Sequence, residues 1–180
     1  MVANIIFLSD TECVIRLHYK AMIEGGTFMN RRDQIRMSDE EIRAFLQEQR
    51  TLQVATIDHD GWPHLVAMWY VLVDDRVVFW TYAKSQKTLN LRRDDRLTCL
   101  VETGTRYDEL RGVQIKGRAI IQDDRETVQR VGETIFERYT GTLNGNTRQL
   151  VAAQAAKRVL IFVEPVEIVS WDHRKLGGGY

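Results

Sequence analysis

Two short turns separate three apolar segments in the first half of the chain, and this spacing restricts the possible folds more than any other feature. Asp58–Gly61 separates the segment Thr51–Ile57 from Leu65–Val73. Asp74 and Asp75 alone then separate Leu65–Val73 from Arg76–Tyr82. Strands joined by such short turns pair antiparallel, because parallel neighbours need a long crossover connection. The sequence therefore predicts antiparallel hairpins and argues against a doubly wound α/β fold.

Every residue of Leu65–Val73 is apolar, without the alternation that marks a strand with one face in water. A continuous apolar run of this length predicts a strand covered on both faces. Two arrangements provide that cover. The strand lies in the centre of a barrel, or it faces the core on one side and a partner on the other.

The remaining chain continues with strands and adds helices late. Further strands are expected at Arg96–Glu102, Gly112–Gln122 and Val159–Trp171. Gly117 predicts a bulge or bend, and Pro165 predicts a break at an edge or bend. Helices are expected at Asp39–Gln49, Lys84–Arg93, Asp123–Tyr139 and Arg148–Lys157. This order predicts a mainly β fold, a six-stranded antiparallel barrel with peripheral helices.

The helix after Tyr82 begins with cations. Lys84 and Lys87 flank the cap residue Ser85, and no acid follows before Asp94. A helix N-terminus carries partial positive charge and favours acids, so this arrangement is unfavourable unless an anion lies there. The pattern fits a phosphate site. On these residues alone, a pair of solvated lysines on a surface helix stays open.

Composition excludes several classes of function. The chain has 25 Lys and Arg against 25 Asp and Glu, so its net charge of zero favours neither nucleic acid nor a membrane surface as a partner. No apolar run is long enough to span a bilayer. Cys13 and Cys99 form no disulfide framework, and the four histidines have no metal-ligand spacing. We expect a cytoplasmic protein without a metal site.

The start of the chain differs from the rest. Met1–Phe28 has no sustained helical or strand period, whereas Ser38 and Glu41 form a capping box before a clear helix. We expect an N-terminal extension over residues 1–36 and one domain over residues 37–180. Our hypothesis is that Met29 is the true start, because Glu24–Gly26 can be encoded by a purine-rich sequence that resembles a ribosome-binding site. The alternative is a disordered or loosely docked arm.

Five segments together resemble one superfamily: Pro63–Tyr70, Lys84–Asp94, Tyr107–Gly112, Glu137–Gly141 and Ser170–Leu176. They resemble the split β-barrel flavin and deazaflavin oxidoreductases that include pyridoxamine 5′-phosphate oxidase. The resemblance is closest to the actinobacterial branch that binds the deazaflavin coenzyme F420. It runs from about Met37 to Leu176, and Met1–Phe28 has no counterpart in it.

The resemblance implies an FMN-binding-like split barrel and a homodimer with cofactor at the subunit interface. The cofactor ring would lie along Ala67, Met68, Trp69 and Tyr70 and against Thr81 and Tyr82. The cofactor phosphate would meet the helix that carries Lys84, Ser85, Lys87 and Asn90, with Lys87 as its first anchor. The partner's C-terminal end would complete the pocket with Trp171, Arg174 and Lys175. For Trp69 and Trp171, positions in the barrel core and the dimer core stay open.

The implied function is hydride transfer between the reduced deazaflavin and an organic acceptor that the sequence does not identify. An FMN-dependent oxidoreductase and a deazaflavin storage protein without turnover are the alternatives. Pyridoxamine phosphate oxidation is disfavoured, because the tail Trp171–Lys175 does not match the expected arginine and histidine pattern. Tyr70, Tyr82 and His64 are all able to donate a proton, and the sequence does not choose among them.

Overall fold

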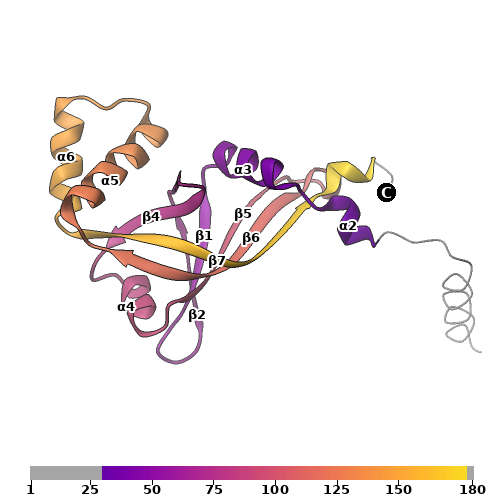
Figure 1. Cartoon of the computed structure of the whole chain (residues 1–180), viewed down its shortest axis with the longest axis horizontal. Coiled ribbons are helices and arrows are strands. Elements are labelled where there is room, and N and C mark those ends of the chain that lie inside the picture. Colours follow the sequence, from indigo (N-terminus) through magenta and orange to yellow (C-terminus); the bar gives the residue numbers. More distant parts are fainter. Residues whose placement is uncertain (1–29, 178–180) are drawn as a thin grey trace, which may run out of the picture. The chain divides into compact units, whose positions relative to one another are not determined.

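The computed structural model describes residues 30–177, and the chain divides into the units Met1–Gln34 and Ile35–Tyr180 (Figure 1). The strands are β1 (Leu52–Ile57), β2 (Pro63–Met68), β3 (Val71–Val73), β4 (Arg76–Tyr82), β5 (Arg96–Thr103), β6 (Arg111–Gln122) and β7 (Arg158–Asp172). The helices are α2 (Arg31–Ile35), α3 (Asp39–Glu48), α4 (Gln86–Arg93), α5 (Arg125–Thr140) and α6 (Gly145–Ala155), with 3₁₀ turns η1 (Tyr107–Glu109) and η2 (His173–Leu176). The proposed start at Met29 lies outside the described residues and stays a prediction.

The strands form one antiparallel sheet in the order β2-β1-β5-β6-β7-β4-β3. Its two edge strands, β2 and β3, are consecutive in the chain and are joined only by Trp69 and Tyr70. So short a connection brings the two edges together, and the sheet must curl. The predicted mainly β split barrel is therefore confirmed.

The sheet has seven strands rather than six, because Leu65–Val73 is not one strand. At Tyr70 the backbone leaves the ladder and bonds to a side chain instead. The Tyr70 N–H donates to the Tyr139 hydroxyl at 3.0 Å, and this hydroxyl lies 3.1 Å from the Tyr70 carbonyl. The Tyr70 ring is fully buried, and its hydroxyl donates to the Leu46 carbonyl at 2.6 Å. These bonds separate the run into β2 and β3.

The apolar run is also not covered on both faces within the chain. Along β2, partly buried residues alternate with exposed ones, and Leu65 is 64% exposed. Of the two arrangements considered for this run, central burial is therefore wrong for the single chain. Trp69 is 51% exposed and stacks on Tyr139 with ring centroids 4.5 Å apart, so it does not belong to the barrel core.

Two hydrophobic clusters lie on opposite faces of the curled sheet. The inner cluster is the barrel core and includes Leu52, Val54, Phe79, Cys99, Val113 and Ile161. The outer cluster packs α5 and α6 onto β4 and β7 through Val78, Trp80, Val131, Ile135, Val151 and Leu160. In Figure 1, these two helices lie together at the end of the sheet where β7 begins. The alternation of β4 between the clusters explains why Trp80 faces the helices.

Several local predictions are confirmed. Ser38 and Glu41 form the capping box of α3. Asp74 and Asp75 take positive φ values of 48° and 60° in the turn between β3 and β4. The ladder between β6 and β7 shifts register at Gly117, which lies opposite Pro165.

Two predicted boundaries were wrong. Val159–Trp171 is not broken at Pro165, because the register shift opposite Gly117 accommodates this residue inside a continuous β7. The last helix begins at Gly145 rather than Arg148, because Asn144 and Thr147 form a capping box that starts it earlier. Among the described residues, no helix is long and apolar enough to cross a membrane.

We expect Tyr139→Phe to lower the free energy of unfolding by about 1–3 kcal/mol, because it leaves the Tyr70 N–H without an acceptor. Urea denaturation followed by circular dichroism measures this change. Tyr82→Phe is the matched control, because the hydroxyl of this exposed tyrosine has no hydrogen-bond partner in the described chain. Equal stability of the two variants would contradict the role assigned to Tyr139.

Candidate functional site

The start of α4 is fixed against the barrel by polar contacts. Asn90 is buried, and its amide donates to Thr56 Oγ1 on β1 at 3.1 Å. Ser85 occupies the N-cap position, but its side chain does not cap the helix. Its hydroxyl instead lies 3.1 Å from the hydroxyls of both Thr81 and Thr88. The first turn of α4 therefore keeps backbone N–H groups without a side-chain cap, and it holds no acid.

Lys87 lies in this first turn and points back to the end of β4. Its ammonium donates to Thr81 Oγ1 at 3.2 Å. Burial, and then the positive charge of Arg158, lower the pKa of Lys87 from its ordinary value. Within residues 30–177, no carboxylate forms an ion pair with Lys87 or with the exposed Lys84. An incompletely compensated ammonium beside a helix N-terminus is suited to bind an anion.

Arg158 adds a second cation beside the end of β4. It begins β7 and pairs with Tyr82 in the ladder. Its guanidinium carbon lies 4.4 Å from the ring centroids of both Trp80 and Tyr82. The Arg158 Nε atom is buried and has no hydrogen-bond partner within residues 30–177. No acid of the described chain pairs with this guanidinium either, so the region carries uncompensated positive charge.

A hollow adjoins Arg158 on the outer face of the sheet. Its walls come from the end of β2 and the residue that follows it, from β4 and from the helices α5 and α6, and they comprise Ala67, Met68, Trp69, Trp80, Ile135, Phe136, Gln154 and Arg158. The lining is apolar and aromatic except for Gln154 and Arg158. Such a surface is suited to a flat ring with an anionic substituent.

The structure brings one part of the predicted site residues together. Ala67, Met68 and Trp69 line the hollow, and Thr81, Ser85 and Lys87 meet at the start of α4. Tyr82 is 51% exposed beside them. The side chains of Tyr70 and Asn90 are buried and bonded within the chain, so they offer no free group to a ligand.

The three C-terminal site residues lie at the other end of β7. Trp171 covers Gly112, where an added Cβ would approach its ring to 2.1 Å. Arg174 pairs with Asp172 at 2.5 Å, and Lys175 pairs with Glu41 at 2.6 Å. Roughly 45 Å of strand separates them from Arg158. Only a second copy of the chain brings these residues to the hollow, so their predicted role depends on a dimer.

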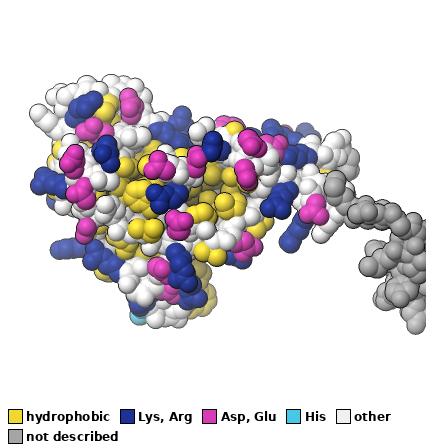
Figure 2. Space-filling view, in the orientation of Figure 1, with side chains coloured by type: hydrophobic (Ala, Val, Ile, Leu, Met, Phe, Trp, Pro, Cys, Tyr) yellow, Lys and Arg dark blue, Asp and Glu magenta, His cyan; other side chains and the backbone are white. Residues whose placement is uncertain are grey.

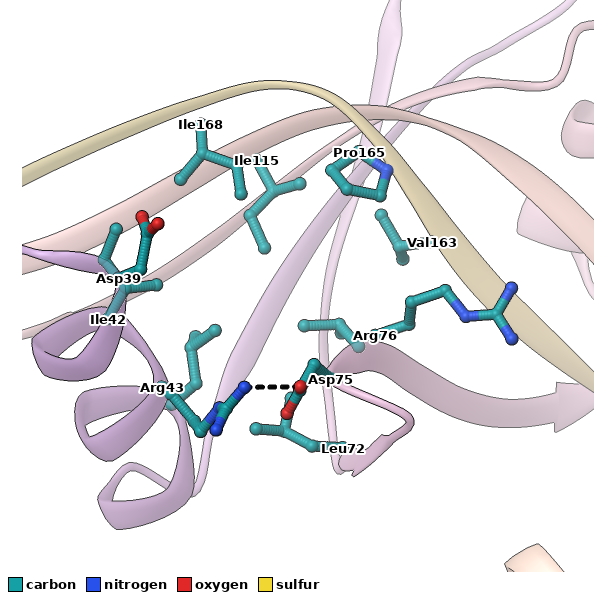
Figure 3. A pocket seen from close by; sticks show the side chains of 12 residues that line it. Asp39, Ile42, Arg43, Leu72, Asp75, Arg76, Ile115, Val163, Pro165 and Ile168 are labelled. Carbon is teal, nitrogen blue, oxygen red and sulfur yellow. Dashed lines mark hydrogen bonds and ion pairs between the residues drawn. The ribbon is translucent and has the colours of Figure 1, made fainter.

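A second hollow lies between α3 and the strands β3, β6 and β7 (Figure 3). Its floor is apolar and includes Ile42, Leu72, Ile115 and Val163. At its mouth, Arg43 and Asp75 pair with one another (Figure 3). Arg76 pairs with Glu164 at 3.5 Å. Because these cations already have acidic partners, this hollow offers less to an anion than the one beside Arg158.

Sequence reasoning missed Arg158, Trp80 and the lining from α5 and α6. The sequence predicts a strand that contains Trp80 but does not assign the face of the strand on which this side chain lies. Arg158 follows Lys157 and directly precedes the apolar run Val159–Val163, and a cation at the start of a buried strand is a usable signal. Its neighbours depend on which strand pairs with β7, and this pairing crosses a long stretch of sequence.

Comparison with known proteins places this geometry in a family. Residues 38–172 match the family model described as pyridoxamine 5′-phosphate oxidase. The chain therefore belongs to the pyridoxamine 5′-phosphate oxidase family. The comparison with curated proteins found no match.

Solved structures share the fold. The conserved hypothetical protein Rv2991 from Mycobacterium tuberculosis is 44% identical, with a TM-score of 0.79 over 84% of this chain and 95% of that one. A protein described as an F420 reductase is 24% identical, with a TM-score of 0.58 over 70% of this chain and 94% of that one. The heme storage protein HutZ from Vibrio cholerae is 19% identical, with a TM-score of 0.58 over 73% of this chain and 94% of that one. The last two similarities show the fold alone.

We expect Lys87 to titrate below 10.5, the ordinary value, because burial and Arg158 both disfavour its protonated form. Removing the charge in Arg158→Met should raise the Lys87 pKa part of the way back, since burial remains. NMR of the lysine side chains as a function of pH measures both values. A Lys87 pKa that does not change in Arg158→Met would show that the two cations are not neighbours.

Proposed function

We propose that the chain binds coenzyme F420 and acts as an oxidoreductase, passing a hydride between the reduced cofactor and a small organic acceptor. The bound deazaflavin supplies the hydride chemistry. The protein's own residues bind the phosphate, orient the ring and exclude water. The observation that carries the proposal is Lys87 at the start of α4, which has no acidic partner among the described residues, together with the apolar hollow that Arg158 lines in a fold of this family.

The residues fit a phosphate-bearing ring cofactor. A phosphate at the first turn of α4 meets the Lys87 ammonium, the hydroxyl group of Ser85 and free backbone N–H groups. The ring then extends over Ala67–Trp69, where the lining is apolar. Lys84 and Arg92 are exposed and have no acidic partner in the described part of the chain, which suits the anionic tail of F420. These cations favour F420 over FMN, which has no such tail.

We further propose that the protein is a homodimer whose interface includes β2 and the second half of β7. On β7, every residue from Glu164 to Val169 is exposed in the single chain, including Val166 at 72% and Ile168 at 41%. Figure 2 shows hydrophobic side chains gathered in the middle of one face, with charged side chains around them. Contiguous exposed apolar surface of this kind is typical of an interface.

We propose that a second copy of this chain covers the exposed apolar surface of β2 and β7. Within one chain, the three C-terminal site residues are remote from the hollow. They are Trp171, Arg174 and Lys175. A partner subunit that covers the second half of β7 also brings its own C-terminal turn to the shared interface. The predicted contribution of these residues to the pocket therefore requires a dimer.

FMN-dependent oxidoreduction and cofactor storage without turnover are the rival functions. The fold admits both, since it is shared with an F420 reductase and with a heme storage protein. FMN would use the same phosphate site and ring surface. Comparing the affinities of F420 and FMN for the purified protein distinguishes the proposed function from FMN-dependent oxidoreduction. Reduction of an acceptor by the loaded protein distinguishes it from cofactor storage.

We expect Lys87→Ala to weaken F420 binding by about 1.5–3 kcal/mol, because it removes a charge-assisted contact to phosphate. Isothermal titration calorimetry measures the change in affinity. Lys84→Ala should weaken F420 binding less than Lys87→Ala does, because Lys84 is exposed. Arg130→Ala is the control, an exposed cation on α5 that lies outside the site. Unchanged affinity in Lys87→Ala would remove this residue from the site.

We expect the wild-type protein to have the mass of a dimer by light scattering, and Val166→Asp to have the mass of a monomer. The charge is tolerated in the monomer, because this position is 72% exposed. It is costly in an apolar interface. Leu150→Asp on α6, where the side chain is 49% exposed, is the control and should remain dimeric. A monomeric wild type, or a dimeric Val166→Asp, would contradict the proposed interface.

A further inference from the structure

Arg158 is held in an unusual way for a half-buried cation. The faces of Trp80 and Tyr82 lie against its guanidinium, each with a ring centroid 4.4 Å from the central carbon. Aromatic faces attract a cation, and they also restrict it to one plane. They cannot satisfy the N–H donors, which point outward in that plane. The position of the guanidinium is therefore fixed, while its N–H groups form no hydrogen bond with the described residues.

The missing hydrogen bonds are the main observation. The Nε atom of Arg158 is buried without a partner, and it is the only such side-chain atom within the described residues. Leaving a buried charged donor unsatisfied is unfavourable, and native proteins rarely do so without a reason. The terminal nitrogens of the same guanidinium also have no partner among the described residues, and they are the donors that an external acceptor in the adjoining hollow meets.

The surrounding charge specifies the kind of acceptor. Lys87 is near enough for the charge of Arg158 to lower its pKa, so two like charges share this region. No carboxylate of the described chain pairs with either one. Two neighbouring cations without an acid repel one another, and an anion between them removes the repulsion. A phosphate group presents several oxygens to both cations, and guanidinium groups bind it through paired hydrogen bonds.

The lining of the hollow indicates which kind of ligand carries the anion. Arg158 lines the same hollow as Ala67, Met68 and Trp69, which form the proposed ring surface. An anion bound by Arg158 is therefore adjacent to a ligand that lies on that surface.

We propose that Arg158 is a specificity-determining residue that binds the cofactor's phosphate jointly with Lys87, with its guanidinium oriented by Trp80 and Tyr82. The inference rests on the proposed function and deepens it. It assigns to one residue the selection of a phosphate-bearing cofactor over the same ring without phosphate. Lys87 supplies charge from a flexible stem, whereas Arg158 supplies a fixed plane of donors.

Two pairs of ligands test the proposal: coenzyme F420 against its phosphate-free chromophore, and FMN against riboflavin. We expect Arg158→Met to weaken binding of the phosphate-bearing member of the preferred pair by about 10- to 100-fold. Binding of the phosphate-free member should change by less than about twofold. Arg158→Lys keeps the charge without the planar donors and should fall between the wild type and Arg158→Met. Calorimetry or ring fluorescence gives the dissociation constants.

Equal losses for both members of a pair, or no loss for either, would overturn the proposal. Arg130→Met is the matched control and should bind like the wild type, because it removes an exposed arginine of α5. Thermal unfolding of each variant shows whether Arg158→Met is folded at the temperature used. If Arg158→Met is unfolded, the test uses Arg158→Lys alone. This variant should then lose affinity for the phosphate-bearing ligand and keep its affinity for the phosphate-free one.

Titration with inorganic pyrophosphate separates failure of this inference from failure of the proposed function. If the wild type binds no ring ligand, the proposed function fails. Pyrophosphate binding that is lost in both Arg158→Met and Lys87→Ala would then still support a shared anion site. Absence of pyrophosphate binding to the wild type together with absence of ring binding would overturn both.

Discussion

The hydrogen bonds between the Tyr139 hydroxyl and the backbone of Tyr70 are the interaction on which the rest of the structure depends. They take the place of ladder bonds where the chain passes from one edge of the sheet to the other. Arg138, the preceding residue of α5, donates to the carbonyls of Leu46, Gln47 and Gln49 at the end of α3. One turn of α5 therefore fixes both the curl of the sheet and the helix beside it.

The curl gives β4 two different environments, and the candidate site follows from that division. One side of β4 faces the barrel core through Phe79, and the other faces α5 and α6 through Trp80. Gly132 of α5 permits this contact, since a Cβ there would lie 2.6 Å from the Trp80 ring. Trp80 is thereby fixed beside Arg158, where the strand ends and α4 begins. The packing of the outer layer thus positions a charged group next to an apolar hollow.

Local signals made most of the fold predictable from the sequence. The turn at Asp74 and Asp75, the capping box at Ser38 and the glycine at the register shift all depend on neighbours in the chain. The unusual charge at the start of α4 also lies within one short segment, and it led directly to Lys87. The division of Leu65–Val73 and the position of Arg158 depend on Tyr139 and Tyr82, which lie 69 and 76 positions away from Tyr70 and Arg158 in the chain. Periodicity carries no information about contacts of that kind.

We propose that this protein binds a phosphate-bearing deazaflavin. Titration of the purified wild-type protein with F420 and, separately, with FMN, followed by tryptophan fluorescence, tests it most directly. The account predicts saturable quenching by F420 at a lower concentration than by FMN, because exposed cations near α4 favour the longer anionic cofactor. Tighter binding of FMN would make this an FMN protein, and binding of neither would contradict the account of the site.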